Sequence, residues 1–106
     1  MRSRFGGLVS TPLAVPWFRA GDYARCREMM DDRDRLPSTF AEWERGAQDR
    51  LDGLSGFGQS LEIVEIDPDE FAAFCAAQGL RPNGMARNAY ACVKLAQKQR
   101  ENGRPN

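Results

Sequence analysis

Apolar residues first take up a helical period about twenty residues into the chain. Tyr23, Cys26 and Met30 are spaced by three and four positions, which places them on one face of a helix. We expect this helix to begin near Arg19 or Ala20. It must end before Pro37, because proline cannot continue a helix.

A second apolar stripe predicts a helix over about residues 39–54. Thr39 followed by Glu42 forms a candidate capping box at its start, with Ser38 as the rival cap. The apolar positions that follow step by three or four residues, and they are Phe40, Trp43, Ala47, Leu51 and Leu54. We interpret this stripe as a face buried in the core. The glycine-rich run SGFG ends the pattern.

The stretch LEIVEIDPDEF predicts a strand that leads directly into a third helix. Residues 61–66 are rich in β-forming side chains. Asp67 is placed to cap the helix, with Pro68 at its first position. Gly79 fits the cap at its other end.

The last helix is expected to run from about Asn83 to Arg100. Its apolar side chains share one face, and they are Met85, Ala89, Cys92 or Val93, and Ala96. Residues 101–106 are expected to form a frayed tail.

These elements predict an α-rich α+β fold with four helices and one confident strand. The chain of 106 residues suits a single domain, in which residues 1–15 form an extended arm. A lone strand leaves backbone groups unpaired, so the strand at 61–66 needs a partner. Either the N-terminal arm or a second copy of the chain can supply it, and the sequence leaves both alternatives open.

Composition indicates an ordinary globular protein with unevenly placed charge. Hydrophobic residues make up 42% and charged residues 28%, and the net charge is zero. Residues 61–80 carry five acids and no base, whereas residues 81–106 carry six bases and one acid. The chain has no apolar run of the roughly 20 residues that a membrane span needs. The N-terminus lacks an unbroken apolar segment of the kind found in signal peptides, so a cytoplasmic protein with no membrane partner is expected.

The residue types that carry common chemistry are scarce. The chain has no histidine, which excludes Ser-His-Asp and Cys-His catalysis. No phosphate-binding loop is present. Cys26, Cys75 and Cys92 form no CxxC motif, and we expect them to be small buried apolar residues, with a reactive thiol as the alternative. We therefore assign no catalytic, cofactor-binding or metal-ligating residue and expect a protein that is not an enzyme.

Three motifs resemble those of a family of small uncharacterised bacterial proteins. They read W-F…D-Y, then L-P-x-T-F-x-E-W, then I-D-P-D-x-F-x-x-F-C-x-x-x-G-L, and they lie within residues 16–91. The family has no established activity, so the resemblance implies no site residue.

Protein binding is the function that the sequence favours. Separated acidic and basic segments can orient a charged partner. Trp17, Phe18 and Phe57 flank breaks in the predicted elements and are candidate anchors for a partner protein, although core burial is the competing interpretation of each.

The alternative is a dimeric DNA-binding regulator, because residues 61–100 follow the order of a ribbon-helix-helix protein. In that fold, strands from two chains pair and enter the major groove. A homodimer would then form through the strand at 61–66. Nucleic-acid contacts would come from Asn83, Gly84, Arg87, Lys94 and Lys98. Against this reading, both faces of the strand carry a glutamate, which phosphate repels.

Overall fold

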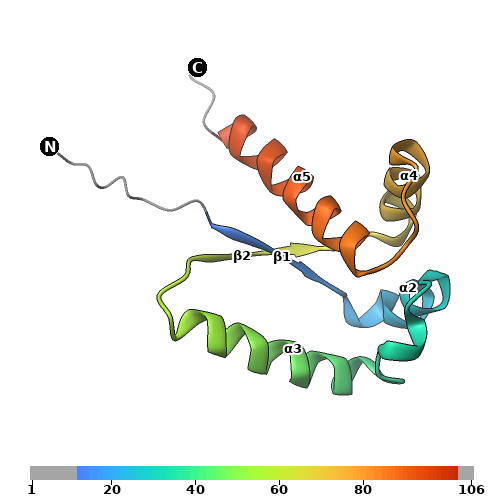
Figure 1. Ribbon diagram of the computed structural model, residues 1–106, viewed down its shortest axis with the longest axis horizontal. Helices are drawn as coiled ribbons and strands as arrows, with labels where there is room; N and C mark the ends of the chain where they lie inside the picture. The colour runs from blue at the N-terminus through green and yellow to red at the C-terminus, as the bar shows by residue number, and fades with distance from the viewer. Residues whose placement is uncertain (1–11, 103–106) are drawn as a thin grey trace, which may run out of the picture.

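The computed structural model describes residues 12–102. Within that range the elements follow one another as β1 (Leu13–Trp17), η1 (Ala20–Asp22), α2 (Tyr23–Met29), η2 (Arg33–Arg35), α3 (Phe40–Ser55), β2 (Leu61–Glu65), α4 (Pro68–Gln78) and α5 (Gly84–Asn102). Four α-helices and a two-stranded sheet confirm the expected α-rich α+β class (Figure 1).

The predicted strand finds its partner within the same chain. β1 and β2 run parallel, with Leu13 opposite Leu61 and Trp17 opposite Glu65. A parallel pair needs a long crossover, and the segment containing α2 and α3 supplies it. Of the two alternatives, pairing with the N-terminal segment is therefore confirmed, through residues 13–17. Residues 1–11 of the expected arm lie outside the described range.

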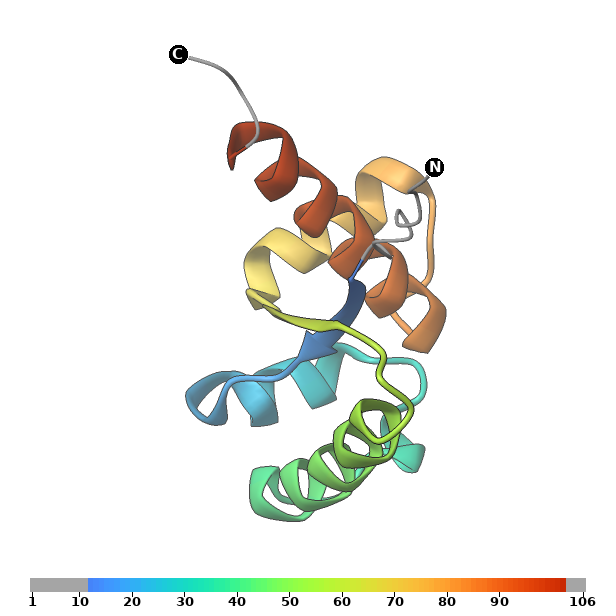
Figure 2. The ribbon, with the colours of Figure 1, turned by 90° about the vertical axis from the view of Figure 1, so that its left-hand side faces the viewer.

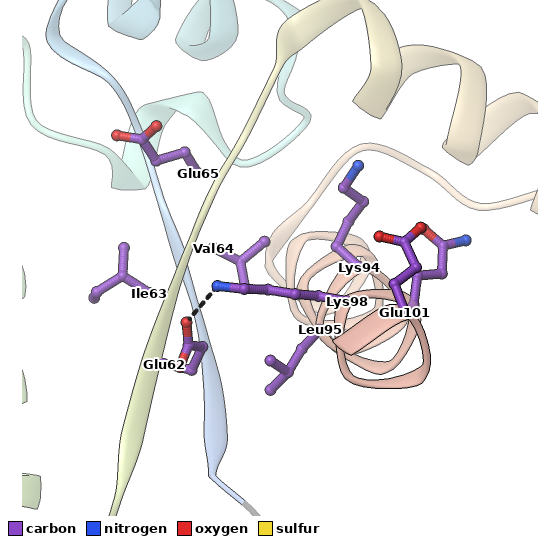
Figure 3. Close-up of a pocket in the computed structure, with 9 residues that line it drawn as sticks. Glu62, Ile63, Val64, Glu65, Lys94, Leu95, Lys98 and Glu101 are labelled. Atoms are coloured by element: carbon purple, nitrogen blue, oxygen red, sulfur yellow. Dashed lines mark hydrogen bonds and ion pairs between the residues drawn. The ribbon is translucent and has the colours of Figure 1, made fainter. Parts of the chain in front are cut away.

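Helices lie on both sides of the two strands. Figures 1 and 2 show α5 on one side of the strands and α3 on the other. At the end of β1, Trp17 contacts Trp43 of α3 edge to face, with ring centroids 4.9 Å apart. On the opposite side, Glu62 and Val64 of β2 point toward α5 (Figure 3).

The core is built largely from aromatic rings. Phe18 contacts Tyr23 and Trp43, at centroid distances of 5.3 and 4.9 Å. Across α4 and α5, Phe71 meets Tyr90 edge to face at 5.6 Å. Edge-to-face pairs of this kind each contribute about 0.5–1.5 kcal/mol beyond the burial of their area. These contacts join α2, α3 and the end of β1 to one another and α4 to α5.

The predicted caps are present. The hydroxyl oxygen of Thr39 accepts a hydrogen bond from the Glu42 N–H, so Thr39 and not Ser38 caps α3. Asp67 caps α4 in the same way, by accepting from the Glu70 N–H. These bonds satisfy N–H groups that a helix start leaves without a partner.

Gly79 ends α4 in the left-handed conformation, with φ of +66°. Its own N–H and that of Leu80 bond to carbonyls of the last turn. A residue with a Cβ is strained at this φ, which explains the glycine.

The predicted buried face of the last helix is wrong. Met85, Cys92 and Val93 are exposed. The side chains of α5 that are buried instead are Ala86, Tyr90, Ala91 and Leu95. The helix packs against the sheet and also against α4, so its buried face includes a tyrosine whose polar tip is hydrogen-bonded. A prediction from the spacing of purely apolar residues therefore selects the wrong face of α5. The helix also continues to Asn102, past the expected end.

Within residues 12–102, no helix combines the length and the apolar composition needed to cross a bilayer.

Candidate functional site

A hollow on the described part of the molecule runs along one edge of the sheet. We call it the β1 groove. It has a volume of about 540 Å³ and is lined by residues 13–18, by α3 between Trp43 and Leu54, by Ile66, and by α5 between Gly84 and Cys92. Residues 61–65 of β2 do not line it. The groove therefore lies at the edge of β1 that faces away from β2.

The wall of the groove that α3 forms is only partly covered. A helix of 16 residues extends about 24 Å, whereas a five-residue strand extends about 17 Å. The first half of α3 buries Trp43 and Ala47. Its second half continues the apolar stripe, but Leu54 remains 38% exposed, and Leu13 at the start of β1 is 44% exposed. The stripe predicted to lie in the core is thus only half covered.

The hydrogen bonds between the strands fix which backbone groups face the groove. The Leu13 N–H donates to Ser60 O at 2.9 Å, and the Ile66 N–H donates to Trp17 O at 3.0 Å. In a parallel ladder, alternate residues direct both their N–H and their C=O toward the partner strand. The odd-numbered residues of β1 therefore direct their backbone N–H and C=O groups toward β2.

The even-numbered residues of β1, Ala14 and Pro16, face the groove. Ala14 directs an N–H and a C=O there, and Pro16 directs a C=O alone because proline has no N–H. No hydrogen bond to these groups is found among residues 12–102. The outer edge of β1 thus presents one donor and two acceptors between the two flanking helices. Proline within a strand is typical of such an edge position.

The charge along the groove is of one sign. Among residues 12–102, its only charged lining residues are Arg50 and Arg87, and no carboxylate lines it. Arg87 is bidentate to Asp32, with both N–O distances 3.0 Å, and its guanidinium carbon lies 5.5 Å from the centre of the Phe18 ring. These hydrogen bonds hold the pKa of Asp32 below its ordinary value. Arg50 is exposed and forms no ion pair within residues 12–102, so it is the unneutralised charge of the groove.

Cys92 adds an exposed thiol to the groove wall. Cys26 and Cys75 are buried, as expected, and burial raises the pKa of Cys26 to about 11. The expectation that all three cysteines are buried is therefore wrong for Cys92, because the last helix turns a different face to the core.

A second hollow, of about 320 Å³, lies between β2 and α5 (Figure 3). Lys98 extends across it to Glu62, with an N–O distance of 3.0 Å. Ile63 and Glu65 point to the other side of the sheet. An ion pair spanning the hollow joins its two walls, and we interpret this contact as structural.

A hydrogen-bonded group joins α4 to α5. The Tyr90 hydroxyl donates to Glu70 Oε1 at 2.5 Å, and Lys94 Nζ lies 3.1 Å from a Glu70 oxygen. Burial, followed by the bond to Glu70, raises the pKa of Tyr90. The bonds from Tyr90 and Lys94 lower the pKa of Glu70. Each charge in this group has a partner of opposite sign, so its evident role is to hold the two helices together.

The three candidate protein-binding residues lie in different environments. Trp17 is partly buried and lines the β1 groove. Phe18 is buried in the core beside Trp43 and is not available for direct contact. Phe57 is 90% exposed in the turn that follows α3. The sequence did not indicate that Trp17 borders a groove, although Pro16 within a β-forming run was a usable signal for an open strand edge.

The candidate nucleic-acid contacts are largely occupied by contacts within the chain. The side-chain oxygen of Asn83 caps α5 by accepting from the Ala86 N–H. Gly84 lines the β1 groove. Each basic side chain of the proposed stripe is paired with a carboxylate, and the pairs are Arg87 with Asp32, Lys94 with Glu70 and Lys98 with Glu62.

Among residues 12–102, acidic and cysteine side chains form no group of three that could hold a metal ion. Comparisons of the chain with family models, with curated proteins and with solved structures find no match.

Proposed function

We propose that this chain is a non-enzymatic, cytoplasmic protein-binding module whose partner docks in the β1 groove. The observation that carries the proposal is the combination of an apolar groove with an open strand edge at its floor. Leu13 and Leu54 are exposed on its walls, and the outward groups of Ala14 and Pro16 are available for hydrogen bonds.

A polypeptide fits this combination better than a compact ligand does. Extended peptides bind at open sheet edges, where main-chain hydrogen bonds supply affinity and neighbouring pockets receive side chains. The two flanking helices provide such pockets, because α3 offers Leu51 and Leu54 and α5 offers Cys92. Leucines left exposed beside an open edge also indicate a surface that another chain covers.

The DNA-binding alternative has less support. In a ribbon-helix-helix dimer the strand pairs with the strand of a second chain. Here β2 instead pairs in parallel with β1 of its own chain. Contacts between basic residues and phosphate supply most of the affinity for DNA. Here Lys94 and Lys98 are paired with glutamates on the surface, which leaves them less available to phosphate.

A matched pair of variants tests the docking surface. Leu54 lies in the groove and Leu80 lies outside it, and they are 38% and 41% exposed. We expect a protein that the wild-type chain captures stoichiometrically from lysate to be lost with Leu54→Glu, because a carboxylate then replaces an apolar contact. The same protein should be retained with Leu80→Glu. Equal capture by the two variants would contradict the proposal.

A further inference from the structure

We infer that the partner of the β1 groove is an extended, mainly apolar peptide segment that adds to β1 as a third strand and places a carboxylate at Arg50. This inference rests on the proposed function and specifies the chemistry of the bound segment. Three features of the groove carry it: its shape, the hydrogen-bonding groups along its floor and the sign of its charge.

The backbone of β1 specifies an extended occupant. Ala14 offers one N–H and one C=O, and Pro16 offers one C=O, all from the same edge of the strand. A segment that meets all three groups supplies two N–H donors and one C=O acceptor. Only a strand supplies them at the spacing of alternate residues, because successive residues of a strand direct these groups to opposite sides. A helix has its interior backbone groups bonded within itself.

The walls specify apolar side chains on the bound segment. Side chains of an added strand alternate between the α3 side and the α5 side of the sheet. On the α3 side they would meet Leu51 and Leu54, and on the α5 side they would meet the exposed thiol of Cys92. Both sets of contacts favour apolar groups at successive positions of the segment.

The charge of the groove specifies an acidic group. The described part of the lining holds two arginines and no acid, and Asp32 already neutralises Arg87. Arg50 therefore offers a guanidinium without a carboxylate partner within residues 12–102, beside an apolar surface that excludes water once covered. A carboxylate on the segment gains a charge-assisted hydrogen bond there, whereas a basic group is repelled.

A second copy of the chain is a different occupant of the same groove. Two β1 edges could pair with each other and make a dimer. Each copy would then bring its Arg50 to the interface, and the described lining of the other copy's groove has no acid to pair with it. Like charges across an interface are unfavourable, so charge favours a separate, acidic partner.

The test starts from a library of random peptides about eight residues long, displayed and selected on the full-length chain. Counter-selection on Leu54→Glu removes peptides that bind elsewhere. We expect the selection to enrich apolar peptides that contain at least one acidic residue. They should protect Cys92 from alkylation, since that thiol lines the groove.

Two modifications then separate the parts of the inference. Arg50→Glu should weaken binding of a selected peptide by about tenfold or more, because a charge-assisted hydrogen bond is replaced by repulsion. Arg45→Glu, an exposed position of α3 outside the groove, should leave binding unchanged. N-methylation of the peptide should abolish binding at one set of alternate residues and be tolerated at the other, because only one set faces β1.

The outcomes distinguish the inference from the function on which it rests. Selected peptides without acidic residues, or with equal tolerance of both N-methylation sets, would overturn the inference and leave the docking groove in place. Failure to select any peptide that discriminates wild type from Leu54→Glu would overturn both. A wild-type dimer that Leu54→Glu converts to a monomer would identify a second copy as the occupant and overturn the acidic peptide.

Discussion

At the scale of single residues, the Asp32–Arg87 pair is the ion pair most withdrawn from solvent in the described chain. The two side chains are 22% and 13% exposed, and the guanidinium also lies over Phe18. The pair holds the start of α5 against the segment between α2 and α3. It consequently fixes one wall of the β1 groove.

Replacement of Asp32 by asparagine should destabilise the fold. The change leaves the Arg87 guanidinium without its charged partner in a largely enclosed site, and we expect the free energy of unfolding to fall by about 2 kcal/mol. Urea denaturation at neutral pH measures this. Asp31→Asn is the control, because its partner Arg81 is mostly exposed, and it should change stability little.

The same pair should make stability depend on acid pH. The folded-state pKa of Asp32 is lowered, so its contribution is complete above the unfolded-state value of about 3.9 and is lost as pH falls through the folded value. The difference in unfolding free energy between wild type and Asp32→Asn should therefore shrink below about pH 4. A difference that stays constant down to about pH 2 would show that the carboxylate charge is not its source.

The cysteines offer a simple check of the side-chain environments. We expect one thiol per chain to react rapidly with iodoacetamide in the native protein and mass mapping to place it at Cys92, which is exposed. Cys26 should react only on unfolding, because it is buried and its pKa is raised to about 11. Rapid native reaction at Cys26 or Cys75 would contradict the described packing.

At the scale of elements, two glycines in or beside helices should respond to alanine in opposite directions. Gly79 has φ of +66°, where a Cβ is strained, so Gly79→Ala should lower the free energy of unfolding by about 1 kcal/mol or more. Gly53 lies within α3, where an added Cβ would meet open space, so Gly53→Ala should raise the same free energy by about 0.5–1 kcal/mol. Thermal unfolding of both variants measures the signs, and equal signs would contradict the assigned backbone.

The helices also show how far element-level prediction from sequence reaches. Helix caps can be predicted from sequence, because they depend on residues that are neighbours in the chain. The start of α3 at Thr39 and the two ends of α4 at Asp67 and Gly79 were predicted in this way. The buried face of α5 depends on which elements surround it. Tyr90 packs inward with its hydroxyl bonded to Glu70, and Met85 faces solvent, so apolar periodicity pointed to the wrong face.

At the scale of the whole molecule, the fold class was predictable and the candidate site was not. The strand at 61–66 and its need for a partner were evident in the sequence. The β1 groove exists because two helices flank one strand edge, and that arrangement is not local in the sequence. For Phe18 the sequence allows both an anchor for a partner and core burial, and only the assembled core shows that the side chain is enclosed.

The chain should be a monomer in solution when no partner is present. Its strands pair with each other, so neither needs a second copy to complete the sheet. Light scattering after size exclusion, over a dilution series, should give the mass of one chain. A dimer that persists on dilution would contradict this expectation.

Docking of a partner at the outer edge of β1 is reported most directly by the amide of Ala14. It is the one N–H that β1 directs into the groove, because Pro16 has none. Hydrogen exchange followed by NMR would compare the free chain with its complex with a selected peptide. We predict fast exchange at Ala14 in the free chain and slowing of about tenfold or more in the complex, with little change at Val15, which already bonds to β2. Unchanged exchange at Ala14 on binding would show that the partner does not dock on this edge.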